Sequence, residues 1–114
     1  MESKELIRLF LPQFVSNHFD VIKIENREGR IDIYLDEQKI IPKGLPKRKL
    51  ISHGFTASIT IQDFPIRGQA VYLHVRRRKW LDTETNTIHS CNYDLTYDGT
   101  QLTEEFVAFL KATN

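Results

Sequence analysis

A run of arginine and aromatic residues in the second half of the chain has the composition of a binding surface. Residues 69–80 (QAVYLHVRRRKW) alternate between apolar and polar types, as expected for a strand with one face on the core. The core face would carry Val71, Leu73 and Val75. The opposite face would carry Tyr72, His74, Arg76, Arg78 and Trp80. Because arginine binds phosphate through two parallel hydrogen bonds and aromatic rings stack on bases, the run predicts contact with nucleic acid.

Strict alternation along this strand would place Arg77 and Lys79 on the same side as Val71, Leu73 and Val75, which is the core side. Burying unpaired charge is too costly, so we expect Arg77 and Lys79 to lie beyond the edge of the core, or the strand to twist there. A structural alternative for the whole run is a solvated strand end that forms salt bridges with Asp82 and Glu84. In either case the contacts would be with phosphates or carboxylates and would not read a base sequence.

A second basic cluster lies in residues 38–53, where proline and glycine predict a surface loop. This loop is the one plausible subdivision of a single domain spanning 1–114. Between Gln38 and Leu81 the chain has ten basic residues and one acidic residue, a net charge of +9, whereas the rest of the chain carries −8. Such segregation predicts one strongly positive side. The predicted nucleic-acid-binding residues are Arg76, Arg77, Arg78, Lys79, Trp80, Tyr72, His74, Arg67, Lys47, Arg48 and Lys49.

Other reactive residue types form no recognisable constellation in the sequence. The four histidines are scattered and Cys91 is the single cysteine, so we expect no disulfide within the chain, no metal site and no cofactor. No Ser/His/Asp arrangement can be defined along the chain. A nuclease using Asp63 is a minor alternative. We expect Asp63 to fix the turn before Pro65 and Asp82 to cap the loop after Trp80. The sequence therefore predicts no catalytic residues and a protein that is not an enzyme.

The elements that must position these residues are strands flanked by helices. A short helix over 4–10 would carry Leu6, Leu9 and Phe10 on one face and end near Pro12, followed by a further turn over 13–17. Strands are expected at 19–25, 30–37, 54–64, 69–80 and 88–95, with a helix from Thr103 to about Thr113. The predicted fold is α+β, with an antiparallel sheet of about five strands (a hairpin plus a three-stranded meander) and N- and C-terminal helices.

The segment 61–80 (IQDFPIRGQAVYLHVRRRKW) resembles the core motif of a bacterial insertion-sequence family. Members are short proteins encoded just upstream of a separate catalytic transposase frame. The opening Leu6…Phe10-Leu11-Pro12 and the closing residues 99–111 are also similar. The motif is similar as well to a zinc-binding region of a related transposase group. Trp80 stands where that group has a cysteine, so zinc is not implied here.

The resemblance implies a role in transposition as a non-catalytic accessory protein. Its partners would be DNA at the transposon ends and the catalytic transposase subunit, which would supply the acids for strand transfer. The alternative is a protein-interaction module whose basic face docks an acidic partner, such as that subunit. With no apolar run of ~20 residues and no secretory signal at the start, we expect a soluble cytoplasmic protein without membrane contact.

Overall fold

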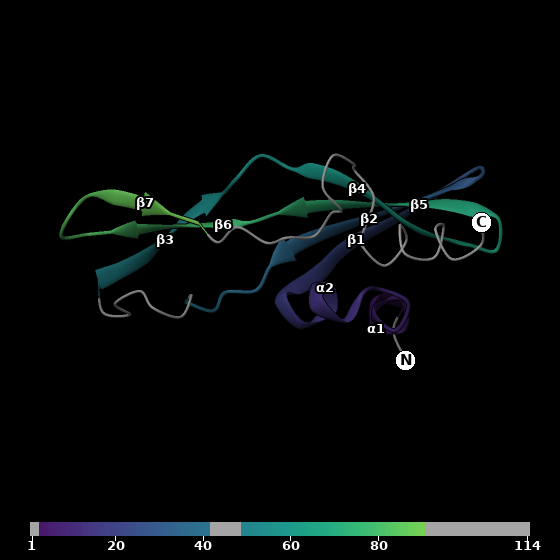
Figure 1. Ribbon diagram of the computed structural model, residues 1–114, viewed down its shortest axis with the longest axis horizontal. Coiled ribbons are helices and arrows are strands. Elements are labelled where there is room, and N and C mark those ends of the chain that lie inside the picture. Colours follow the sequence, from purple (N-terminus) through teal and green to yellow (C-terminus); the bar gives the residue numbers. More distant parts are fainter. Residues whose placement is uncertain (1–2, 42–48, 91–114) are drawn as a thin grey trace, which may run out of the picture.

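The computed structural model describes residues 3–41 and 49–90, which form two short helices and seven strands. Figure 1 shows two sheets that lie end to end along the long axis, with both helices beside the larger sheet. The α+β class predicted from the sequence is confirmed. The elements are α1 (Ser3–Arg8), α2 (Gln13–His18), β1 (Phe19–Arg27), β2 (Arg30–Glu37), β3 (Leu50–Phe55), β4 (Ile59–Ile66), β5 (Gln69–Arg76), β6 (Arg78–Asp82) and β7 (Thr87–His89).

The larger sheet consists of two hairpins joined side by side, in the order β1-β2-β5-β4. The β1–β2 hairpin turns at Gly29, which has a φ of 74° and so adopts a conformation that glycine accepts without strain. β4 and β5 form the second hairpin. Strands β2 and β5 then pair in parallel. The prediction of an antiparallel sheet was wrong at this pair, because the order in which hairpins meet depends on packing and not on local pattern.

The core lies between one face of this sheet and the N-terminal helices. The inward residues of β2 and β5 are the alternating apolar ones predicted from the sequence, and Val71, Leu73 and Val75 are all buried. Leu11 and Val15 pack onto them from the helical side. Pro12 precedes α2 and so separates the two helices, as predicted. The opposite face of the sheet is therefore left to the polar residues of the same strands.

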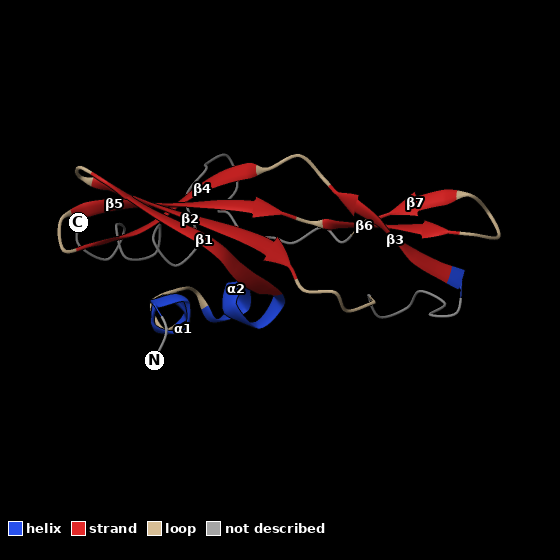
Figure 2. Cartoon of the chain, turned by 180° about the vertical axis from the view of Figure 1, so that it is seen from behind, coloured by secondary structure: helices blue, strands red, loops and turns tan. Residues whose placement is uncertain are grey.

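The smaller sheet, ordered β3-β6-β7, arises because one long hairpin bends in its middle. The predicted strand 69–80 breaks at Arg77 into β5 and β6, and the predicted strand 54–64 breaks at residues 56–58 into β3 and β4. At the break, the Thr56 N–H donates to the Arg77 carbonyl (2.8 Å) and the Arg77 N–H donates to Thr56 Oγ1 (3.1 Å). Both strands thus change sheet at the same point (Figure 2).

The second half of the chain differs in part from the prediction, and some of the predicted features lie outside the described residues. β3 occupies the end of the predicted loop 38–53, so that prediction was wrong from Leu50 onward. β7 matches the start of the predicted strand 88–95. Cys91 and the C-terminal helix lie outside the described ranges, as do Lys47 and Arg48. Within those ranges, neither helix has the length and apolar character needed to cross a membrane.

Candidate functional site

The predicted nucleic-acid strand lies at the junction of the two sheets, and its first arginine is paired with an acid. Arg76 Nε donates to Asp36 Oδ1 (2.7 Å) and Arg76 Nη2 donates to Asp36 Oδ2 (2.6 Å). This is the two-pronged arrangement in which arginine would hold a phosphate. The parallel pairing of β2 with β5 places the two residues opposite each other. The pair raises the pKa of Arg76, chiefly through the hydrogen bond to Asp36.

Arg78 is also engaged within the chain. Its backbone N–H donates to Glu37 Oε1 (2.7 Å) and its Nε donates to the Glu37 carbonyl (2.8 Å). The guanidinium carbons of Arg76 and Arg78 lie 4.3 and 4.7 Å from the centre of the Phe55 ring. The end of β2, the break between β5 and β6 and the end of β3 therefore meet in one cluster, which we call the junction cluster (Asp36, Glu37, Phe55, Arg76 and Arg78).

The remaining predicted contact residues that lie within the described ranges do not form one surface. Trp80 belongs to the smaller sheet and is 3 % exposed, so the prediction that it offers a flat surface for bases is wrong. Lys49 Nζ lies 2.7 Å from Glu84 Oε2. The Arg30 guanidinium lies 4.1 Å from the centre of the Tyr72 ring. Arg77 also interacts within the chain.

Arg67 and Lys79 have no ionic partner within residues 3–41 and 49–90, but Arg67 lies in the turn between β4 and β5, whereas Lys79 lies on β6 in the smaller sheet. Among the described residues, part of the basic run therefore lies against acids from the acidic part of the chain. Asp36 and Glu37 come from the acidic part of the sequence, and the fold brings them to the basic run.

A hydroxyl, an imidazole and a carboxylate form a hydrogen-bonded chain across three strands of the larger sheet. Thr60 Oγ1 lies 3.0 Å from His74 Nδ1, and His74 Nε2 lies 2.6 Å from Asp32 Oδ1. Thr60 and His74 are direct cross-strand partners. Asp32 is 1 % exposed, and Arg30 binds it through Nε and Nη2 at 2.9–3.1 Å. The hydrogen bonds from Arg30 and His74 outweigh burial and lower the pKa of Asp32 to about 2.

The ionised Asp32 determines the state of the histidine ring. A carboxylate can only accept a hydrogen bond, so His74 Nε2 must carry the proton. In the neutral ring Nδ1 is then an acceptor, and the Thr60 hydroxyl donates to it. Tyr34 stacks on the same ring with centroids 4.6 Å apart. The sequence analysis missed this constellation because residues 32, 60 and 74 carry no local signal, and only the register of three strands brings them together.

A hollow of about 390 Å³ lies beside this chain of hydrogen bonds, on the face of the sheet opposite the core. Two ion pairs lie at its rim, so the rim carries positive and negative side chains. Lys23 Nζ lies 3.0 Å from Glu25 Oε1, and Arg76 pairs with Asp36. Hydrogen bonds from Lys23 and Arg27 lower the pKa of Glu25 to about 2. The size is within the range of small-molecule sites. The lining residues are Ile22, Lys23, Glu25, Tyr34, Asp36, Ser58, His74 and Arg76.

The N-terminal helices expose an apolar surface. Leu9 is 71 % exposed and Phe10 is 60 % exposed, and Leu6 and Phe14 are about half exposed beside them. We call these four residues the N-terminal apolar surface. Ile7 and Leu11 make the contacts with the core instead. The predicted helix over 4–10 ends at Arg8, so Leu9 and Phe10 lie in the turn that follows α1, and they are exposed together with Leu6.

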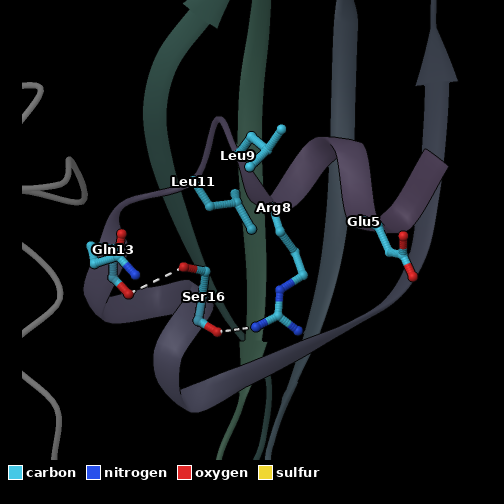
Figure 3. A pocket seen from close by; sticks show the side chains of 6 residues that line it. All are labelled: Glu5, Arg8, Leu9, Leu11, Gln13 and Ser16. Atoms are coloured by element: carbon cyan, nitrogen blue, oxygen red, sulfur yellow. Dashed lines mark hydrogen bonds between the residues drawn. The ribbon is translucent and has the colours of Figure 1, made fainter. Parts of the chain in front are cut away.

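A pocket of about 410 Å³ adjoins the N-terminal apolar surface through Leu9 (Figure 3). Arg8 reaches across it from α1, donates to the Ser16 carbonyl of α2, and lies 3.7 Å from Asp20. Glu5 and Gln13 line the same pocket. The two helices thus present apolar side chains next to a pocket with polar walls.

Metal binding and similarity to known proteins give no further assignment. Within residues 3–41 and 49–90, no three His, Cys, Asp or Glu side chains are grouped as metal ligands. Asp82 Oδ1 accepts hydrogen bonds from the N–H groups of Glu84 (2.9 Å) and Thr85 (3.3 Å), which confirms its predicted role as a cap. No protein-family model, curated protein or solved structure matches the chain.

Proposed function

We propose that this chain is an accessory protein that acts by binding another protein and contributes no catalytic residues to strand transfer. The observation that carries the proposal is the N-terminal apolar surface, where Leu9 and Phe10 are mostly exposed. Contiguous exposed apolar side chains beside a pocket are typical of protein interaction sites. The resemblance of residues 61–80 to an insertion-sequence motif supports the catalytic transposase subunit as the partner.

A second apolar surface supports the same proposal. On the smaller sheet, Ile51 pairs with Leu81 and Leu81 pairs with Ile88, so the three side chains form one cross-strand row. Ile51 and Ile88 are about half exposed. The arginines of the junction cluster, by contrast, already have partners. The described residues therefore offer apolar contacts to a partner more readily than a continuous basic face.

The experiment that tests this proposal measures binding between the purified full chain and a catalytic transposase of the insertion-sequence family that residues 61–80 resemble. A Leu9→Ser/Phe10→Ser variant removes the two most exposed members of the N-terminal apolar surface. Truncating central apolar contacts commonly costs 2 kcal/mol or more, so affinity should fall by about 30-fold or more. Ile40→Ser is the matched control, because Ile40 is 65 % exposed and lies outside this surface. Unchanged affinity in the double variant would remove the support for this surface.

Binding to DNA is the second candidate function, and the exposure of Arg76 favours it. The Arg76 side chain is 45 % exposed, so a phosphate can approach its guanidinium from solvent while Asp36 holds the other side. Lys79 lies on the adjoining strand β6. If about four phosphates are neutralised, the logarithm of affinity should fall with the logarithm of salt concentration with a slope of about −4.

Titration of duplex DNA at two salt concentrations distinguishes the two functions. The wild type is compared with an Arg76→Ala/Lys79→Ala variant and with Lys49→Ala, a cation that is paired with Glu84. DNA contact predicts a smaller slope in the double variant alone. Equal affinities in all three proteins at both salt concentrations would leave protein binding as the function.

A further inference from the structure

The order of groups in the Thr60–His74–Asp32 chain is the one that activates a hydroxyl nucleophile. A carboxylate holds one nitrogen of the ring, and the other nitrogen accepts the hydroxyl proton. The roles of Nδ1 and Nε2 are exchanged relative to the usual serine hydrolase arrangement. The Thr60–His74 hydrogen bond has a normal length of 3.0 Å, and the His74–Asp32 hydrogen bond is short at 2.6 Å. The carboxylate is almost completely buried, whereas Thr60 is exposed on β4 at the edge of the sheet. A reagent in solution can therefore reach the hydroxyl.

We propose that Thr60 is an activated nucleophile that accepts an acyl group from a carboxylic ester. This activity is independent of the binding function proposed above. Thr60 does not itself line the hollow, but its partner His74 does. Ile22 and Tyr34 line the same hollow, which has room for a short apolar acyl group. Arg76 is on the same face, two residues along β5 from the cross-strand partner of Thr60. Its guanidinium is held by Asp36 through Nε and Nη2, so activation of Thr60 depends on the imidazole and the buried carboxylate.

The reaction balances without an added oxidant or metal. Thr60 Oγ1 attacks the ester carbonyl carbon while its proton passes to His74 Nδ1. The other ring proton stays on Nε2, which continues to donate it to Asp32. The bond from the carbonyl carbon to the leaving oxygen breaks, and the leaving group takes the proton from Nδ1. Water then attacks the acyl-threonine, its proton passes through Nδ1 to Oγ1, and the carboxylic acid is released.

The test uses the purified full chain and p-nitrophenyl butyrate as the acyl donor. We expect release of p-nitrophenolate in an initial burst of one equivalent and a butyryl group on the peptide that contains Thr60. His74→Gln should slow acylation by about 100-fold or more, because general base catalysis commonly contributes that factor. Asp32 is a positioning residue. Asp32→Asn should therefore lower the maximal rate while leaving the half-saturating ester concentration unchanged.

Thr60→Val and Thr60→Ser, both on the edge strand β4, separate loss of the hydroxyl from loss of the fold. Thr60→Val preserves the shape and β propensity of an exposed side chain but lacks the hydroxyl, so the burst should disappear. Thr60→Ser restores a hydroxyl and should restore the burst. Ser52→Ala, which removes an exposed hydroxyl on β3 outside the hollow, should react like the wild type. Butyryl groups on Ser58 or on lysines at the same rate in wild type and Thr60→Val would overturn the proposal.

Discussion

Asp32 is the single residue on which the contacts of the polar sheet face converge. Its carboxylate is almost fully buried and accepts hydrogen bonds from Arg30 and from His74. Burying a carboxylate costs free energy unless its oxygens accept hydrogen bonds, and Arg30 and His74 donate those hydrogen bonds. The same contacts keep it ionised, since they lower its pKa from the ordinary 3.8 to about 2. The residue thus links the stability of the sheet to the state of the His74 ring.

At this scale the structure predicts a loss of stability in acid. Because the folded-state pKa of Asp32 is lowered, its contribution is fully present above pH 3.8 and is lost as pH falls through about 2. The contribution is at most about 2 kcal/mol. Asp32→Asn should therefore have a lower free energy of unfolding than the wild type at neutral pH, and the difference should shrink near pH 2. Urea unfolding at both pH values measures it, and a difference that is constant with pH contradicts the assignment. Glu28→Gln is the control, because it removes an exposed carboxylate in the turn between β1 and β2, away from Asp32.

The β4–β5 hairpin is the element that sets the register of Thr60 against His74. Ile66 pairs with Gln69, so its turn consists of Arg67 and Gly68 alone, with φ values of 52° and 78°. Two successive positive φ values define the mirror-image turn that matches the twist of a hairpin. Glycine accepts this conformation freely, whereas arginine does so at a cost. Gly68 thus adopts its turn conformation without strain, whereas the backbone of Arg67 is strained.

Substitutions in this turn should change stability in opposite directions. Gly68→Ala should lower the free energy of unfolding by about 1 kcal/mol, because alanine at positive φ is strained even though a Cβ there would meet no atom within 4 Å. Arg67→Asn should raise it by about 0.5 kcal/mol, because asparagine tolerates this conformation. Denaturant unfolding of the two variants measures both effects. Two changes of the same sign would show that the turn does not limit the stability of the hairpin.

At the scale of the whole molecule, the junction cluster connects two sheets in an elongated body of 51 × 33 × 21 Å. Phe55 comes from β3, its two arginine neighbours come from β5 and β6, and their acids come from β2. Cation–π contacts contribute about 0.5–2 kcal/mol each. The cluster is therefore expected to couple the stability of the smaller sheet to that of the larger one.

Removing the ring at the junction should loosen the smaller sheet selectively. In Phe55→Ala we expect faster amide hydrogen exchange in β3, β6 and β7, and unchanged exchange in the central strands β2 and β5, because those retain the main core. Phe14→Ala is the matched control, since it removes a half-exposed phenylalanine from α2. Uniform acceleration throughout the chain would mean that the two sheets unfold together without a boundary at the junction.

The local features of this fold were predictable where side-chain pattern and turn chemistry act within a few residues. Residues 30–37 alternate apolar and polar types and form β2 with the predicted bounds. Pro12 separates two helical turns as expected. The prediction failed at Trp80, because the period of two continues past Arg77 in the sequence while the strand changes sheet there. The candidate site of Thr60, His74 and Asp32 was not predictable, since its members lie on three strands.

The amino-acid sequence by itself determined the bounds of β2 and the apolar face of β5, because both follow from alternation over short distances. Only the tertiary structure decided which strands lie side by side. The parallel pairing of β2 with β5 sets Asp36 against Arg76 and brings Asp32 within reach of His74. Pairing between residues about forty positions apart depends on the packing of the whole core. As a result, the arginines of the predicted basic strand form ion pairs and hydrogen bonds with β2 at the junction.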